Sequence, residues 1–390
     1  MIPYARQDIT EEDKKAVRDV LESDWLTQGP MVEKFEKSVI NYTGGLFATA
    51  VNSATSALHI SCLALGVKTG DYVWTSPNTF VSSANCAIYC GAKLDFVDID
   101  SRTFNMSINH LEKKLIDAKK SNKLPKVVIP VHFAGLPCDM SRIHELSKEY
   151  KFKIIEDASH AIGSSYMSNK NINIKIGSCT HSDVTVFSFH PVKIITTGEG
   201  GMAVTNNRDI DAKIKLFRTH GITRDQASMS KKSDGPWFYQ QIDIGFNYRM
   251  NDMQAALGYQ QMKRLNNYIK KRNDIANYYS KELKDLPINT PLNREGIISA
   301  FHLYVITLYD NFSKKDHLKI FKKLRAKGIG VNLHYIPVHT HPYYLQMGFK
   351  KGDFIEAEKY YERAISLPMF PNLIQDDQDN VIKTLKEYLQ

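Results

Sequence analysis

The sequence has no long apolar run and only five cysteines. No hydrophobic segment approaches the ~20 residues that a membrane-spanning helix requires, so we do not expect a membrane protein. The first residues are polar and contain no apolar signal-peptide core. An odd number of cysteines without CxxC spacing argues against a disulfide framework and against a zinc ribbon. We therefore expect a cytoplasmic protein without a bound metal.

The charge balance is basic but dispersed. Lysine and arginine number 51 against 42 aspartates and glutamates, a formal charge of +9. The basic residues occur as scattered doublets, such as Lys113-Lys114 and Lys270-Lys271, whereas a nucleic-acid binder usually concentrates them on one face. We expect no nucleic-acid partner. Mild attraction for a small anionic substrate, such as a nucleotide diphosphate, is compatible with this surface.

The order of apolar segments predicts an α/β fold. Near-continuous runs of β-branched and aromatic residues alternate with helical stretches, which is typical of a mostly parallel sheet covered on both faces. A helix over 81–90, ending at Gly91, lies between two of these strands. The expected strands are 46–51, 71–76, 93–99, 126–133, 152–158 and 184–190.

The C-terminal third predicts a smaller α/β domain. Asn251 and Asp252 are good N-cap types for a long helix that runs towards Pro287. Strands are expected over 300–308 and 328–338, and a helix over 354–365. We predict a large domain over 1–250, followed over 251–390 by the linking helix and the small domain, on which the first residues of the chain are able to pack.

Candidate site residues follow the predicted strands, because ligands of open α/β sheets bind beyond the carboxyl ends of the strands. Ala54 and Thr55 begin a helix after the first strand, where free N–H groups suit a phosphate. Asp157 ends a buried strand and needs a cationic partner. Taken alone, each site is better explained as a simple helix cap.

Lys193 is the candidate nucleophile. It follows a strongly hydrophobic strand, then a proline turn, and precedes a glycine-rich turn, so the chain has entered the interior just before this amine. Burial lowers the pKa of a lysine and favours the neutral form that an imine requires. Ser188, five residues earlier, is expected to add a hydroxyl to the phosphate site.

Four motifs in order resemble the signature set of the DegT-type nucleotide-sugar aminotransferases. They are NSATSALH, EDASHA, FSFHPVK…TTGEGG and GFNYRMNDMQAALG, and the similarity extends from Trp25 to Pro368. The resemblance implies the fold type I of pyridoxal-phosphate (PLP) enzymes, with a large domain around a mostly parallel sheet and a smaller C-terminal α/β domain.

The resemblance also implies roles for individual residues. It makes Lys193 the Schiff-base lysine and Asp157 the partner of the pyridine nitrogen of PLP. Asn247 would reach the phosphate of the neighbouring subunit, which implies a homodimer with shared active sites. The other cofactor contacts that it implies are His160 at the phenolic oxygen, Phe80 on the ring, and Ala54, Thr55 and Ser188 at the phosphate.

The implied reaction is transamination of a nucleotide-linked 4-keto-6-deoxy sugar with L-glutamate as amino donor. Within the family the chain is most similar to the branch of pseudaminic acid biosynthesis, whose substrate is a UDP-linked 2-acetamido-2,6-dideoxy-4-keto hexose. A dTDP- or GDP-linked keto sugar of another glycan pathway is the alternative. The expected substrate contacts are Tyr4, Thr27, His334 and Tyr335.

Three rival interpretations are weaker. Family members that dehydrate the sugar carry histidine in place of the Schiff-base lysine, and Lys193 argues against that reaction. A metal hydrolase would use His334, His339 and His341, but their spacing matches no familiar zinc pattern and prolines interrupt it. The third interpretation is a non-catalytic regulator that keeps the PLP fold. The presence of all the expected cofactor residues argues against it.

Overall fold

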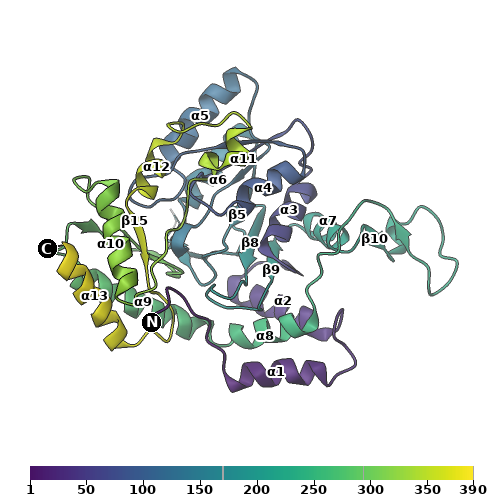
Figure 1. Ribbon diagram of the computed structural model, residues 1–390. Coiled ribbons are helices and arrows are strands. Elements are labelled where there is room, and N and C mark those ends of the chain that lie inside the picture. Colours follow the sequence, from purple (N-terminus) through teal and green to yellow (C-terminus); the bar gives the residue numbers. More distant parts are fainter. Residues whose placement is uncertain (169–170, 293, 390) are drawn as a thin grey trace.

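A seven-stranded sheet forms the centre of the molecule, which the computed structural model describes over residues 1–168, 171–292 and 294–389 (Figure 1). Its strand order is β1-β9-β8-β5-β4-β2-β3. Strand β9 runs antiparallel to β1 and β8, and all other neighbours are parallel, as the sequence predicts. The strands are β1 Phe47–Val51, β2 Tyr72–Thr75, β3 Lys93–Phe96, β4 Val127–Ile129, β5 Lys153–Asp157, β8 Val184–Ser188 and β9 Gly201–Thr205.

Helices cover both faces of this sheet, because alternate strand residues point to opposite sides. On β5, Ile154 belongs to one hydrophobic core and Ile155 to the other. The first face is covered by α2 (Pro30–Thr43), α5 (Ile108–Lys120), α6 (Met140–Tyr150) and α8 (Asp252–Met262). The second face is covered by α3 (Ala54–Ala64), α4 (Ser82–Tyr89) and α7 (Arg208–Arg218).

A second, three-stranded sheet in the order β12-β14-β15 carries the C-terminal part of the chain. Its core is shared with α9, α10 and α13. The first residues join this part, since Ile2 pairs with Ile329. The elements are α9 Leu265–Glu282, β12 Ile288–Asn289, β14 Tyr304–Leu308, α10 Lys314–Ala326, α11 Pro342–Leu345, α12 Ile355–Tyr361, β15 Ala364–Leu367 and α13 Gln375–Leu389.

The remaining elements lie at the periphery. Helix α1 (Glu11–Leu21) runs along α8, and a small sheet joins β13 (Ile297–Ile298), β6 (Ser165–Met167) and β7 (Asn173–Lys175). An arm that contains β10 (Ile222–Thr223) and β11 (Gln240–Gln241) projects away from the body of the molecule (Figure 1). Among the described residues no helix combines the length and the apolar character needed to cross a membrane.

Three expectations for the C-terminal third are wrong in detail. Residues 328–338 form no strand and make only isolated pairings, one of them between Asn332 and Ser366. The helix expected over 354–365 ends at Tyr361, and β15 begins at Ala364 because it pairs with β14. The long helix after Asn251 is divided into α8 and α9. The domain division at residue 250 stays a prediction.

Candidate active site

A cavity of about 480 Å³ lies where β4, β5 and β8 end beside the start of α3. Val131, Asp157 and Ser188 reach it from the carboxyl ends of these strands, which is the expected location in such a sheet. Residues 334 and 335 contribute the opposite wall from the C-terminal part of the chain. Residues that line the cavity include Tyr4, Ala54, Thr55, Phe80, Asp157, His160, Ser188, Lys193, His302, His334 and Tyr335.

Asp157 presents a buried carboxylate to this cavity, with only 3% of the residue exposed. The Ser83 hydroxyl donates to Oδ2 at 2.6 Å, and the Ser159 hydroxyl and backbone N–H donate to Oδ1 at 2.6 and 3.1 Å. None of the ion pairs between described residues includes Asp157. An isolated buried charge is energetically costly, so a cationic ligand in the cavity would stabilise this carboxylate.

Lys193 lies in the turn after β8 and reaches the same cavity. Burial lowers the pKa of its amine to about 8, although the carboxylate of Asp157 acts in the opposite direction. The Lys193 amine makes no hydrogen bond with a described side chain. A lysine with this pKa supplies a substantial fraction of neutral amine near neutral pH, as a nucleophile requires.

The N-terminus of α3 faces the cavity through Ala54 and Thr55. Ser53 is the N-cap and accepts a hydrogen bond from the backbone N–H of Ser56 at 3.1 Å. The first N–H groups of a helix have no acceptor within it, and they lie at the positive end of its dipole. Gly201 of β9 packs so close that an added Cβ would lie 2.4 Å from the Ala54 nitrogen. With the Ser188 hydroxyl, this corner suits a phosphate.

His160 is a buried, neutral imidazole. Burial, together with the nearby Lys193 and His334, holds its pKa well below the usual value. The Ala134 N–H donates to Nδ1 at 3.3 Å, so the proton is assigned to Nε2, which lies 3.1 Å from the Tyr335 hydroxyl. His160 therefore offers an N–H donor towards the cavity wall that Tyr335 completes.

Phe80 and Tyr335 place two neighbouring aromatic rings in the wall of the cavity. Phe80 is 57% exposed, and the centroid of its ring lies 6.2 Å from that of the Tyr335 ring. Burial raises the pKa of the Tyr335 hydroxyl, so it stays protonated. An exposed aromatic face beside a charged cavity is a surface on which a planar ring is able to stack.

His334 and Tyr4 form the side of the cavity nearest the C-terminal part of the chain. Their ring centroids lie 5.6 Å apart. His334 Nδ1 lies 2.8 Å from the Ser366 hydroxyl, and burial followed by the charge of Lys193 lowers its pKa to about 4. Gly330 allows the N-terminal segment to approach, because a Cβ there would lie 2.9 Å from the Tyr4 nitrogen.

Two of the expected site residues do not line this cavity. Thr27 is exposed and pairs with Asn251, and Asn247 is exposed and pairs with Thr219. Asn247 was expected to act in a neighbouring subunit, for which an exposed position is required. The roles of both residues stay predictions.

The histidines that the rival metal-hydrolase interpretation would require do not converge. His339 Nε2 pairs with Glu358 at 2.9 Å and is fully buried, while the His334 ring faces Ser366. No group of three or more potential metal ligands is brought together within the part of the chain that the structure describes.

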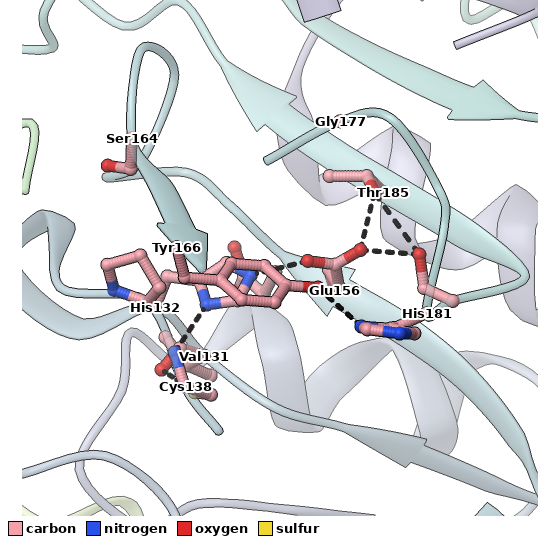
Figure 2. A network of polar contacts seen from close by, with 12 residues as sticks. Val131, His132, Cys138, Glu156, Ser164, Tyr166, Gly177, His181 and Thr185 are labelled. Carbon is pink, nitrogen blue, oxygen red and sulfur yellow. Dashed lines mark hydrogen bonds and ion pairs between the residues drawn. The ribbon is translucent and has the colours of Figure 1, made fainter. Parts of the chain in front are cut away.

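A polar network surrounds the carboxylate of Glu156 (Figure 2), which precedes Asp157 in β5 and therefore points to the opposite face of the sheet. The buried Glu156 carboxylate accepts from His132 Nε2 at 2.8 Å and from Thr185 Oγ1 at 2.9 Å, and also from the Ser182 hydroxyl. The Cys138 N–H donates to His132 Nδ1 at 3.0 Å, which assigns the His132 proton to Nε2. His132 also donates its backbone N–H to the Asp157 carbonyl at 3.1 Å, so the network supports the strand end that carries Asp157.

Several functional positions were not identified from the sequence. Ser83 supports Asp157 from α4, but a serine inside a helix gives no signal of such a contact. Glu199 and His302 also line the cavity. His302 lies within the strand expected over 300–308, whereas β14 begins only at Tyr304, and nothing in the local sequence pattern marks it as a cavity residue.

Comparison with known proteins decides the family. The sequence pattern of the DegT/DnrJ/EryC1/StrS aminotransferase family matches residues 7–386. The chain belongs to this family. It is therefore a sugar aminotransferase, as the motifs predict.

Two curated relatives cover the chain fully. The spore coat polysaccharide biosynthesis protein SpsC of Bacillus subtilis is 37% identical over 100% of this chain and 97% of its own length. The UDP-4-amino-4,6-dideoxy-N-acetyl-β-L-altrosamine transaminase of Campylobacter jejuni is 36% identical over 100% of this chain and 98% of its own.

Solved structures agree in fold. The Helicobacter pylori aminotransferase PseC, involved in pseudaminic acid biosynthesis, has a TM-score of 0.89 and 31% identity, covering 100% of this chain and 99% of its own. A Streptococcus pneumoniae protein assigned as a sugar aminotransferase, in its PMP form, has a TM-score of 0.90 and 30% identity over the same shares. The family and these structures indicate that the cofactor of the present chain is pyridoxal phosphate.

The residues present fit that cofactor. The buried Asp157 carboxylate has no cationic partner among the described residues, and the protonated pyridine nitrogen of PLP is such a cation. Lys193 supplies an amine at the same cavity, and the start of α3 with Ser188 supplies donors for a phosphate.

Proposed function

We propose that this sugar aminotransferase transfers the amino group of L-glutamate to a nucleotide-linked 4-keto-6-deoxy sugar. The preferred acceptor is a UDP-linked 2-acetamido-2,6-dideoxy-4-keto hexose, the substrate type of the pseudaminic acid pathway. The convergence of Lys193 and Asp157 on one cavity beside the α3 N-terminus is the observation that carries the proposal. The relatives from Campylobacter jejuni and Helicobacter pylori support the choice of sugar.

Lys193 and Asp157 have different roles in the proposed reaction. When bound, PLP withdraws electrons from the carbon that carries the amine and makes its proton acidic. Lys193 is the group that takes this proton and returns it, because its amine is partly neutral at pH 7. Asp157 keeps the pyridine nitrogen protonated, and Ser83 and Ser159 keep Asp157 in place.

The remaining cavity residues bind and orient. We assign the cofactor phosphate to the Ala54 and Thr55 N–H groups and the Ser188 hydroxyl, and the face of the ring to Phe80. When the cofactor is bound, the Nε2 proton of His160 would be available to its phenolic oxygen. Tyr4, His334 and Tyr335 line the opposite wall and are assigned to the sugar, and Thr27 remains a predicted contact at the mouth.

We further propose a homodimer in which Asn247 completes the neighbouring site. Asn247 follows β11 and pairs with Thr219 directly after α7, between which residues the chain forms the projecting arm of β10 and β11 (Figure 1). The arm exposes large apolar side chains, and Trp237 and Ile244 are 71% and 77% exposed. Apolar surface of this kind marks an interaction site, and a second copy of the chain is the partner that the shared-site prediction requires.

The substrate is tested with a panel of nucleotide sugars. Purified holoenzyme is incubated with L-glutamate and UDP- or dTDP-linked 4-keto sugars, and the amino-sugar product is identified by mass. We expect fastest amination of the UDP-linked 2-acetamido sugar. Faster amination of a dTDP-linked sugar without the acetamido group would retain the aminotransferase and overturn the proposed pathway.

A further inference from the structure

His302 stands out because its side chain is buried and lacks a polar partner. Only 2% of the residue is exposed, and its ring lines the active-site cavity. Its Nδ1 has no hydrogen-bond partner among the described residues, and the ring's neighbour is His160, whose centroid lies 4.3 Å away. Nε2 likewise makes no hydrogen bond with a described residue, so the ring has unused hydrogen-bonding capacity at the cavity wall, although buried polar groups are normally satisfied.

The backbone that carries His302 is held in an unusual way. The preceding residue, Phe301, has a φ of 42°, in the left-handed region that non-glycine residues rarely adopt. Gly135 makes room for this segment, since a Cβ there would lie 2.8 Å from the Phe301 nitrogen. The Ala300 N–H donates to the Ser164 hydroxyl at 3.0 Å. Strained backbone held by several contacts is typical of functional positions.

A buried cation lies directly behind this segment. Arg272 of α9 is 1% exposed, and its Nη1 donates to the carbonyls of Phe301, His302 and Met369 at 3.0, 3.4 and 3.2 Å. None of the ion pairs between described residues includes Arg272, so its positive charge is not neutralised by a carboxylate. Burial lowers its pKa to about 10, which leaves it charged at neutral pH.

This combination favours an anion at His302. Burial and the nearby groups His160, Lys193, Arg272 and His334 hold the His302 pKa well below its usual value, so the imidazole is neutral in a positive field. Among the described residues that line the cavity, Lys193 is the only lysine or arginine, and the proposed reaction occupies its amine. The amino-acid donor must bring at least one carboxylate into this cavity, and no other cationic group lines it.

We propose that His302 binds a carboxylate of the amino-acid donor, with the buried Arg272 stabilising that anion from behind. This assignment rests on the proposed transamination and names the group that recognises the donor. An imidazole N–H donates to the carboxylate, and the field of the guanidinium adds to the attraction. The deep position suits a small amino acid better than a nucleotide sugar, whose charged diphosphate is bulky.

The test compares His302→Leu, His302→Gln and the control His317→Leu as holoenzymes. Leucine removes the N–H but fits an apolar wall, whereas glutamine keeps a hydrogen-bonding group. His317 lies in α10 and bonds the Ala364 carbonyl at 2.9 Å, away from the cavity. Binding of 2-oxoglutarate is measured by calorimetry, and the half-reactions with glutamate and with the keto sugar are measured in single turnovers.

We expect His302→Leu to weaken 2-oxoglutarate binding and the glutamate half-reaction by about 10- to 100-fold, as loss of one bond to a charged group implies. The sugar half-reaction should change less than threefold, and glutamine should restore part of the loss. Because the leucine variant removes an unpaired polar group, its Tm should equal or exceed that of the wild type. The control should keep wild-type donor binding.

Two results would overturn the assignment. One is 2-oxoglutarate affinity of His302→Leu within twofold of wild type, and the other is equal damage to both half-reactions with a lowered Tm, which would make His302 structural. A wild-type enzyme that glutamate does not convert at all would instead contradict the proposed function. The two failures are therefore distinguishable.

Discussion

Glu156 and Asp157 are consecutive residues of β5, and their carboxylates lie on opposite faces of the central sheet. Asp157 faces the cavity, whereas Glu156 faces the network of His132, Ser182 and Thr185 (Figure 2). The alternation of the strand thus separates a carboxylate at the cavity, to which we assign a role with the cofactor, from a carboxylate held in a buried hydrogen-bond network. Replacing Glu156 should therefore affect stability, and replacing Asp157 should affect activity.

Glu156→Ala should lower the free energy of unfolding by about 3–5 kcal/mol, because it leaves a buried imidazole N–H and two hydroxyls without their acceptor. The measurement is the calorimetric Tm of the apo-protein, with the exposed Glu149→Ala as control. Burial alone would raise the pKa of the Glu156 carboxyl, but His132, Ser182 and Thr185 lower it overall.

The stabilisation from Glu156 should therefore be present above its ordinary pKa of 4.5 and disappear as the pH falls through the lowered value. The difference in stability between wild type and Glu156→Gln should shrink in acid. A difference that grows on acidification would contradict this sign.

Asp157→Asn should keep the fold and some bound PLP but reduce turnover by several orders of magnitude. The scale is that of losing a dedicated catalytic carboxylate, ~10⁴-fold. The carboxylate accepts three hydrogen bonds from the protein and forms no ion pair among the described residues, which is why we propose that its charge serves the cofactor. Turnover within tenfold of wild type would mean that the pyridine nitrogen has another partner.

Attachment of PLP to the apo-protein should follow the Lys193 pKa of about 8. As the pH rises through this value the amine loses its proton, so the rate of attachment should increase and then level off. At pH 7 about 10% of the amine is neutral, compared with about 0.03% for an ordinary lysine. The visible cofactor band gives the rate at each pH, and a midpoint above pH 9.5 would contradict the prediction.

The shared-site proposal is tested by mixing two inactive variants. Lys193→Ala and a crippled Asn247→Ala enzyme, exchanged at random, should form some heterodimers with one intact site and recover part of the activity. Subunit exchange is verified with differently tagged chains. If the mixture stays inactive although exchange is proven, Asn247 does not act across the dimer.

The sequence predicts the central sheet well because its strands are buried on both faces and therefore strongly apolar. Lys193 and Asp157 are found as candidates because Asp157 ends such a strand and Lys193 lies in the turn after another; both line the cavity, and their roles stay predictions. Segment 328–338 reads as a strand, yet its few pairings are with distant residues such as Ile2 and Ser366. Residues 364–367 join β14, and this long-range pairing overrides the local helical pattern.

The break between α8 and α9 has a tertiary origin. No glycine or proline marks it, but Arg264 at this point pairs with Asp13 of α1 at 2.5 Å. His302 was missed for a similar reason. Its burial, its unpaired nitrogen and the cation behind it arise from contacts with α9 and with the segment around Gly135, which sequence spacing does not reveal.

The central claim is that Lys193 holds the cofactor of this sugar aminotransferase. Purified enzyme should be yellow, and reduction with borohydride should fix the cofactor covalently. Proteolysis and mass spectrometry then locate the modified residue. We expect the label on the peptide that contains Lys193, and no label in the Lys193→Ala variant. A label on any other lysine would contradict the assignment of Lys193.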